Sequence, residues 1–225
     1  MPDKTILAID TATAYAGLAL YDENGVQAEE TWRAARHHTT QVAGRLARML
    51  ETARLAPGDL QGLAVTLGPG SFTGLRIGLA LAKGLALPHK LPIVGVPTLD
   101  VVAYPHRDSP LPVWAVVQAG RGRIAAAGYA WRESRWQQTQ PARITTLADL
   151  VAALDAPALL VGEIGAADEA LVENSGARAS DIVVAPPSLR LRRPGVLAEL
   201  GAQQLARHER SPLDQLAPIY LQTPA

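Results

Sequence analysis

The alternation of apolar and polar residues along the chain predicts a regular order of strands and helices. Short apolar runs at Ile6 to Asp10 and Gly17 to Tyr21 predict two strands. The sequence Asp22-Glu23-Asn24-Gly25 is typical of a hairpin turn, and Val26 to Arg33 predicts the returning third strand.

A helical period follows these three strands. Apolar residues recur at helical spacing from Thr39 to Leu55, and Pro57-Gly58 ends the predicted helix. A strand at Leu63 to Leu67, a helix at Thr73 to Leu87 and a strand at Ile93 to Val96 come next. Three hairpin strands followed by helix, strand, helix and strand are typical of the actin/hexokinase-like (ribonuclease H-like) fold.

The second half of the chain repeats this order less regularly. The predicted elements are paired strands at 113–117 and 124–131, a helix at 147–154, a strand at 158–161, a helix at 166–174, a strand at 182–185 and a helix at 194–208. We therefore expect an α/β protein of the ASKHA class with two duplicated subdomains, an N-terminal one at 1–104 and a less regular C-terminal one at 105–225.

The run from Gly68 to Gly78 joins a predicted strand to a predicted helix. Its glycines permit a sharp turn and a close approach of backbone or ligand. Ser71 or Thr73 is suited to cap the helix, and the free N–H groups before it are suited to an anion. A tight strand-to-helix turn without any ligand is the equally weighted alternative.

The helix after this run is apolar nearly all round, since Arg76 and Lys83 are its only charged residues from Leu75 to Leu87. Small residues recur at every fourth position, at Gly74, Gly78, Ala82 and Ala86. Such a helix is buried on more than one side. It is either a central helix packed on its own sheet or one whose opposite face packs on another subunit.

Composition narrows the possible functions. The chain has 225 residues, 21 Lys+Arg and 21 Asp+Glu, and this zero net charge argues against a nucleic-acid binder that works alone. The chain has no cysteine, which excludes disulfides, iron–sulfur clusters and a cysteine nucleophile. No apolar run reaches membrane length, and no signal segment is visible, so we expect a soluble, cytoplasmic protein.

Two kinds of residue could carry catalytic chemistry. Among the five histidines only His37 and His38 are adjacent in sequence, and they point about 100° apart on a helix, so a metallopeptidase site is disfavoured and no metal is expected. Asp10 ends the first strand, where actin-like ATPases hold magnesium, but Ala12 stands in a phosphate turn that lacks glycine. We favour an Asx turn at Asp10, with weak or vestigial nucleotide binding at a site that also includes Thr11, Gly68, Gly70 and Ser71.

Several segments resemble one protein family. Ile6 to Thr13, the Gly68-to-Gly78 run, Lys83-Gly84-Leu85-Ala86, Pro92 to Leu99 and the ending Pro218-Ile219-Tyr220-Leu221 are similar to those of the TsaB (YeaZ) family. The resemblance is strong over residues 5–100 and collinear to the end. It implies tRNA modification, in which threonylcarbamoyladenosine is made beside the anticodon.

The resemblance also implies a role and partners. TsaB-like proteins are non-catalytic paralogues that dimerise with and activate a TsaD-like catalytic subunit, a small TsaE-like ATPase joins the complex, and tRNA is bound only through the complex. A homodimer is implied for the chain alone, and ATP or ADP at the junction of the complex is left open. The implied interface lies on the two N-terminal helices, at His38, Val42, Arg45, Thr73, Gly74, Arg76, Gly78, Ala82 and Lys83.

The start of the second half departs from the family pattern, because Gln118 stands where the family has Asp and Arg123 where it has Glu. Arg121 and Arg123 are expected on a solvated hairpin, with a basic edge toward tRNA as the lesser alternative. Trp131 and Trp136 allow a base-stacking platform, although a strand with one buried indole is the more common arrangement.

Overall fold

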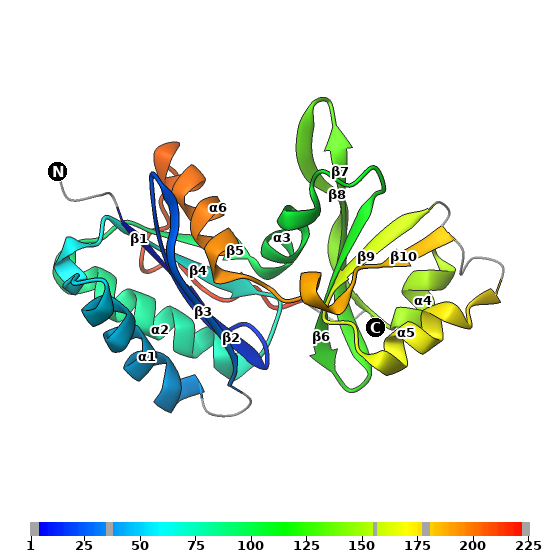
Figure 1. Cartoon of the computed structure of the whole chain (residues 1–225), viewed down its shortest axis with the longest axis horizontal. Helices are drawn as coiled ribbons and strands as arrows, with labels where there is room; N and C mark the ends of the chain where they lie inside the picture. Colours follow the sequence, from blue (N-terminus) through cyan, green and yellow to red (C-terminus); the bar gives the residue numbers. More distant parts are fainter. Residues whose placement is uncertain (1–4, 35–37, 155–156, 177–180, 222–225) are drawn as a thin grey trace. The chain divides into compact units, whose positions relative to one another are not determined.

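The computed structural model describes residues 5–34, 38–154, 157–176 and 181–221 (Figure 1). The chain divides into two compact units. Unit 1 contains residues 1–98 and 193–219, and unit 2 contains residues 99–192 and 220–225. Each unit is built on one five-stranded sheet.

The sheet of unit 1 has the strand order β3-β2-β1-β4-β5. Its strands are β1 (Ile6–Asp10), β2 (Tyr15–Asp22), β3 (Gly25–Arg33), β4 (Gly62–Gly68) and β5 (Ile93–Pro97). The first three strands form antiparallel pairs, whereas β4 and β5 run parallel to β1. The predicted hairpin turn forms between β2 and β3, where the Asn24 N–H donates to Asp22 Oδ1 at 2.7 Å.

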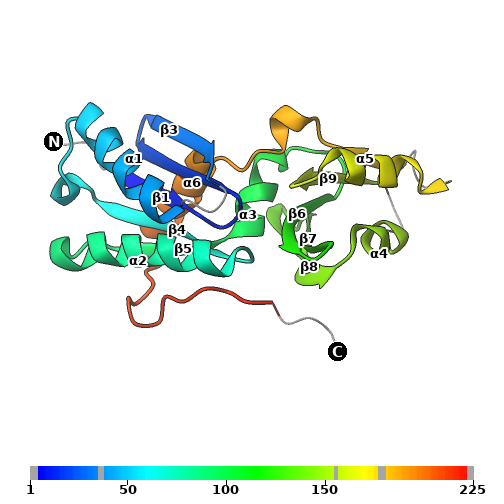
Figure 2. The same cartoon turned by 90° about the horizontal axis from the view of Figure 1, so that it is seen from below.

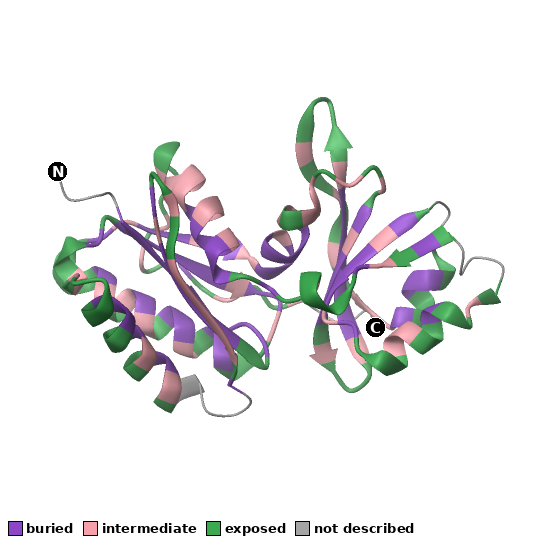
Figure 3. Cartoon of the chain, in the orientation of Figure 1, coloured by how far each residue is buried: buried purple, intermediate pink, exposed green. Residues whose placement is uncertain are grey.

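Helices cover both faces of this sheet (Figures 1 and 2). They are α1 (His38–Thr52) and α2 (Phe72–His89) on one face and α6 (Pro194–Ala206) on the other. Alternate residues of the strands serve the two faces, as the period of a strand requires. Leu7 and Ile9 join the core under α1 and α2, whereas Ala64 lies against Gly201 of α6. Figure 3 shows the central strands buried on both sides.

Unit 2 repeats the same topology with the order β10-β9-β6-β7-β8. Its strands are β6 (Val113–Gly120), β7 (Arg123–Arg132), β8 (Arg135–Thr145), β9 (Ala158–Gly162) and β10 (Ile182–Val184). Helices α4 (Leu147–Ala152) and α5 (Ala166–Glu173) pack on one face and α3 (Thr98–Ala103) on the other. Among the described residues, short 3-10 helices lie at Tyr104–His106 and Pro187–Leu189 in this unit and at Pro57–Asp59 in unit 1. The expected duplication of an actin-like subdomain is confirmed.

Each unit includes one helix that follows the last strand of the other unit. Helix α6 follows the last strand of unit 2 but belongs to unit 1, and α3 follows β5 but packs in the core of unit 2. The expected division at residue 104 therefore differs from the observed units. At the start of α6 the Glu29 carboxylate of β3 pairs with Arg193 and accepts the Gly195 N–H at 2.8 Å.

Strand β8 was not predicted from the sequence. It is an edge strand of the second sheet, and six of its eleven residues are exposed. A polar edge strand lacks the apolar alternation by which half-buried strands are recognised. The backbone pairing with β7 defines it instead.

One carboxyl group in unit 2 makes stability depend on pH. Burial raises the pKa of Asp100 above its usual value of 3.8, although the hydroxyl of Tyr129 donates to Asp100 Oδ1 at 2.7 Å and opposes the shift. Burial and the neighbouring carboxylate also raise the pKa of Tyr129. The folded chain therefore favours the protonated Asp100, and this contribution to stability is lost as the pH rises from about 4 through the raised pKa.

We expect Asp100→Asn to increase the free energy of unfolding at pH 7, because the amide keeps the acceptor for Tyr129 without a buried charge. The advantage over the unmodified chain should shrink as the pH falls toward 4. Urea denaturation of both proteins between pH 4 and pH 8 measures this. A difference in stability that is the same at every pH would contradict the assignment.

Candidate functional site

The predicted glycine run forms the turn from β4 into α2. Gly68 ends the strand with φ of 114°, a left-handed conformation that favours glycine, and the following peptide bond to Pro69 is cis. Ser71 is the N-cap of α2, since its hydroxyl accepts the Gly74 N–H at 3.2 Å. Of the two residues suited to cap this helix, Ser71 and Thr73, Ser71 is therefore the one that does so.

The β1–β2 loop of the same unit packs directly into this run. The Ser71 N–H donates to the carbonyl oxygen of Ala12 at 2.6 Å, and Thr11 Oγ1 donates to the carbonyl oxygen of Gly74 at 2.7 Å. A Cβ atom at Gly70 would lie 2.1 Å from the oxygen of Ala12. The glycines are thus needed for a close approach of backbone from this chain.

The same constraint continues one turn along α2. A Cβ atom at Gly74 would lie 2.1 Å from the Thr11 carbonyl oxygen, and one at Gly78 would lie 2.3 Å from Thr11 Oγ1. Both distances are far shorter than van der Waals contact. The row of small residues on α2 therefore faces its own sheet and loop.

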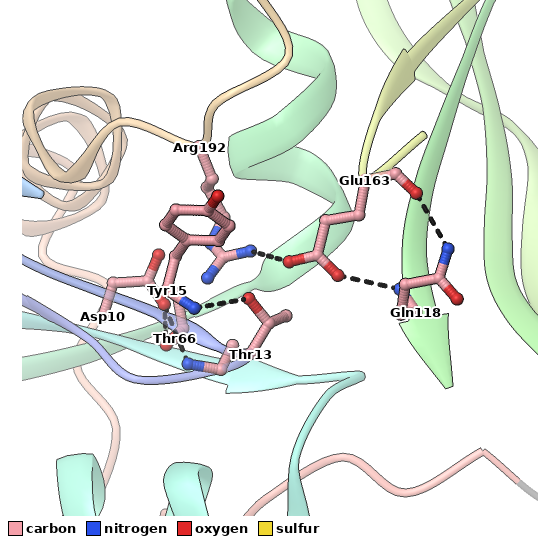
Figure 4. A network of polar contacts seen from close by, with 8 residues as sticks. Asp10, Thr13, Tyr15, Thr66, Gln118, Glu163 and Arg192 are labelled. Carbon is pink, nitrogen blue, oxygen red and sulfur yellow. Dashed lines mark hydrogen bonds and ion pairs between the residues drawn. The ribbon is translucent and has the colours of Figure 1, made fainter. Parts of the chain in front are cut away.

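Asp10 closes the Asx turn that the sequence favoured. Its Oδ1 accepts the Ala12 N–H at 3.0 Å and the Thr66 hydroxyl at 3.1 Å, and the residue is only 2% exposed (Figure 4). In the same loop the Tyr15 N–H donates to Thr13 Oγ1 at 3.4 Å. The bond between Asp10 and Thr66 holds the turn on the central strands β1 and β4.

The five residues predicted to bind nucleotide come together at this one end of the first sheet. Asp10, Thr11 and Ser71 make the hydrogen bonds described above, and Gly68 and Gly70 give the turn its shape. Each of these residue types is thus explained by contacts within the unit. Nucleotide binding by them stays a prediction.

The residues predicted for a partner interface separate into two groups. Four of them, Val42, Gly74, Gly78 and Ala82, are buried within this chain. Their prediction as interface surface is wrong, because they pack in the core under α1 and α2 or against Thr11. Periodic small residues indicate close packing without specifying the partner that approaches.

The other predicted interface residues lie at or near the surface. Thr73 and Arg76 are exposed, and Lys83 is half-buried. Arg45 is half-buried, forms an ion pair with Glu30, and has its guanidinium 4.5 Å from the ring centroid of Trp32. His38 begins α1, but its side chain and all of His37 lie outside the described residues.

The exposed side of α2 carries two of the residues predicted for the interface, Thr73 and Arg76. It consists of Phe72, Thr73, Arg76, Ala80, Gly84 and Leu87, which we call the outer face. Phe72 is 53% and Leu87 is 71% exposed, and the Arg76 guanidinium lies 3.8 Å from the centroid of the Phe72 ring. Phe72, Ala80, Gly84 and Leu87 were not among the predicted residues, although the apolar character of the helix opposite its buried row predicted a second packing face.

The segment that departs from the family pattern forms its own polar network in unit 2 (Figure 4). The Gln118 N–H donates to Glu163 Oε2 at 2.9 Å, and the Gln118 side-chain amide donates to the Glu163 carbonyl oxygen at 3.0 Å. The guanidinium of Arg192 lies 3.7 Å from Glu163 Oε1. Gln118 therefore joins the end of β6 to the end of β9.

Two features are absent from the part of the chain that the structure describes. No group of three or more His, Cys, Asp or Glu side chains there is arranged to hold a metal ion. None of the helices in that part of the chain is long and apolar enough to cross a membrane.

The same strand order in both sheets defines an actin/hexokinase-like protein with two duplicated subdomains. Residues 25–175 match the family model described as TsaD, tRNA N6-adenosine threonylcarbamoyltransferase. The tRNA threonylcarbamoyladenosine biosynthesis protein TsaB of Bacillus subtilis is 31% identical over 96% of this chain and 93% of its own length. TsaB of Escherichia coli is 38% identical over 55% of this chain and 54% of its own length.

The solved structures agree with this fold. YeaZ from Pseudomonas aeruginosa superposes with a TM-score of 0.78 at 23% identity, covering 97% of this chain and all of that one. The chain belongs to the TsaB (YeaZ) family, which acts in the biosynthesis of threonylcarbamoyladenosine in tRNA.

Two glycines of α2 give a matched test of the packing at the β1–β2 loop. We expect Gly74→Ala to destabilise the fold by about 1–3 kcal/mol, because the added methyl group overlaps the Thr11 carbonyl oxygen. Gly84→Ala meets no atom within 4 Å and should stabilise the helix by about 0.5–1 kcal/mol. Urea denaturation measures both, and equal stability of the two variants would contradict the packing role.

Proposed function

We propose that this chain is a non-catalytic subunit that dimerises with a TsaD-like catalytic paralogue and activates it for threonylcarbamoyl transfer to tRNA. A TsaE-like ATPase joins this assembly, and tRNA is handled by the complex. Membership in the TsaB family supports the pathway. The observation that carries the scaffold role is the outer face of α2.

The outer face has the composition of a protein-binding surface. Its two large apolar residues, Phe72 and Leu87, are more than half exposed and lie near the two ends of the helix, and exposed large apolar residues favour an interface. Ala80 and Gly84 lie between them and are exposed, so a second helix can approach the α2 backbone closely there.

Helix α1 extends this surface. The two helices pack side by side on the same face of the first sheet, and Ala43, Gly44 and Ala47 of α1 are exposed small residues. A Cβ atom at Gly44 would meet nothing within 4 Å. We therefore assign the partner interface to the outward sides of both helices, including Thr73, Arg76 and Lys83.

The packing of the β1–β2 loop also supports an accessory role. In an independent actin-fold ATPase or kinase, this loop would leave backbone N–H groups for phosphates. Here the loop instead uses its Ala12 oxygen and its Thr11 hydroxyl to bind the start of α2. The loop therefore works as a support for the interface helix.

The same outer face serves a homodimer when the chain is alone, so a second copy and the TsaD-like protein compete for it. This competition is measured by light scattering coupled to size exclusion, on the chain alone and mixed with the TsaD-like protein of the same organism. We expect a homodimer that gives way to a one-to-one heterodimer. A chain that ignores the TsaD-like protein would overturn the proposal.

Gly84→Arg locates the interface, because it places a long charged side chain where a partner backbone approaches and meets no atom of its own chain. We expect at least a tenfold loss of heterodimer affinity with no loss of thermal stability, since about 1.4 kcal/mol corresponds to tenfold. Ala206→Arg, at the exposed end of α6 on the opposite face of the sheet, is the control. Heterodimer affinity that is equal in both variants would contradict the assigned surface.

A further inference from the structure

A pocket of about 570 Å³ opens on unit 2 where β6, β7 and β8 meet the end of α4. Polar side chains and one aromatic ring are among the groups that line it. Its lining includes Trp114, Arg132, Gln137, Gln138, Gln140 and Leu154. Nothing in the proposed interface of unit 1 involves these residues.

The aromatic ring in the lining is the indole of Trp114. Trp114 on β6 pairs with Gly128 on β7, which in turn pairs with Gln140 on β8. A Cβ atom at Gly128 would lie 3.3 Å from Cε2 of Trp114 and 3.1 Å from Cβ of Gln140. Because Gly128 has no side chain, the indole of Trp114 and the aliphatic part of the Gln140 side chain can both lie close to its backbone.

Several polar side chains around this indole are free to bind a ligand. Arg132, Gln137 and Gln140 are exposed, and within the described ranges their side chains make no hydrogen bond or ion pair with the chain. The Arg143 guanidinium lies 5.9 Å from the centroid of the Trp114 ring. The pocket lining thus combines an aromatic ring, glutamine amides and the Arg132 guanidinium, and the Arg143 guanidinium lies beside the ring.

The segment that forms the pocket carries a strong excess of positive charge. Residues 113–145 contain five arginines, no lysine or aspartate and a single glutamate, Glu133, although the whole chain has zero net charge. Three of the four tryptophans of the chain also lie in this segment. Arginine beside exposed aromatic rings is the composition that binds single-stranded nucleic acid.

The other two tryptophans of this segment have structural partners. Trp131 Nε1 donates to the Arg107 carbonyl oxygen at 2.6 Å, and Trp136 stacks on Tyr129 with ring centroids 6.0 Å apart. Trp114 is therefore the tryptophan of the segment that lines the pocket.

We propose that this pocket binds an unpaired base of RNA, which stacks on Trp114 and is hydrogen-bonded by Gln137 and Gln140. Glutamine amides offer a donor and an acceptor to the edge of a base, and Arg132 and Arg143 offer charge-assisted hydrogen bonds to the flanking phosphates. The inference rests on the proposed function, in which the complex handles tRNA, and it gives unit 2 a direct contact with that RNA.

The test is a titration of the full chain into a fluorescently labelled single-stranded RNA of twelve adenosines, followed by anisotropy at several salt concentrations. We expect saturable binding. An unlabelled RNA duplex of the same length should be a poor competitor, because its bases are paired and stacked within the helix. Trp114→Leu should weaken binding by about fivefold to 150-fold, the range for stacking of one base, without changing the salt dependence.

The double variant Arg132→Gln with Arg143→Gln changes only exposed groups and so avoids the risk that Trp114→Leu disturbs the sheet. It should reduce the slope of log K against log salt by about 1.4, since each phosphate contact on a single strand contributes about 0.7. Arg207→Gln, exposed on unit 1 beside Glu209, is the matched control and should leave the slope unchanged.

The possible outcomes separate this inference from the proposed function. Absence of RNA binding, or equal effects of the pocket variants and Arg207→Gln, overturns the pocket assignment even when the heterodimer with the TsaD-like protein forms. RNA binding that depends on Trp114 supports the assignment, whether or not that heterodimer forms. Competition by the duplex as effective as by the single strand would also overturn it.

Discussion

The packing of the β1–β2 loop into the start of α2 is the contact on which the rest of unit 1 depends. Backbone atoms of Thr11 and Ala12 lie so close to Gly70 and Gly74 that no side chain fits between them. Two hydrogen bonds, from the Ser71 N–H and from Thr11 Oγ1, fix the approach. This contact sets the rotation of α2 about its axis, and therefore which residues of the helix face outward.

Much of this fold was predictable from local patterns. The strands of unit 1, helices α1 and α2, the cap at Ser71 and the Asx turn at Asp10 follow from periodicity and turn chemistry within a few residues. The observed order of strands then matches the actin-like order in both units. The family could also be recognised, because the Gly68-to-Gly78 run and the first strand are distinctive in sequence.

The remaining features depend on contacts between residues far apart in sequence. The row Gly74, Gly78 and Ala82 signalled close packing, but only the position of Thr11, more than sixty residues earlier, shows that the chain itself fills it. Helix α6 joins the first sheet through Glu29, a contact across 166 residues that no local pattern reveals. Strand β8 has an exposed polar sequence and is defined by its pairing with β7.

The chain has no cysteine, so a single introduced cysteine reports directly on the central claim that the outer face of α2 is the partner interface. The measurement is the rate of maleimide labelling of Ala80→Cys, on dilute protein and then with an excess of the TsaD-like protein, with Ala206→Cys as the reference. The account predicts rapid labelling of both alone and protection of position 80 only in the complex. A heterodimer that forms while position 80 is labelled as fast as before would contradict it.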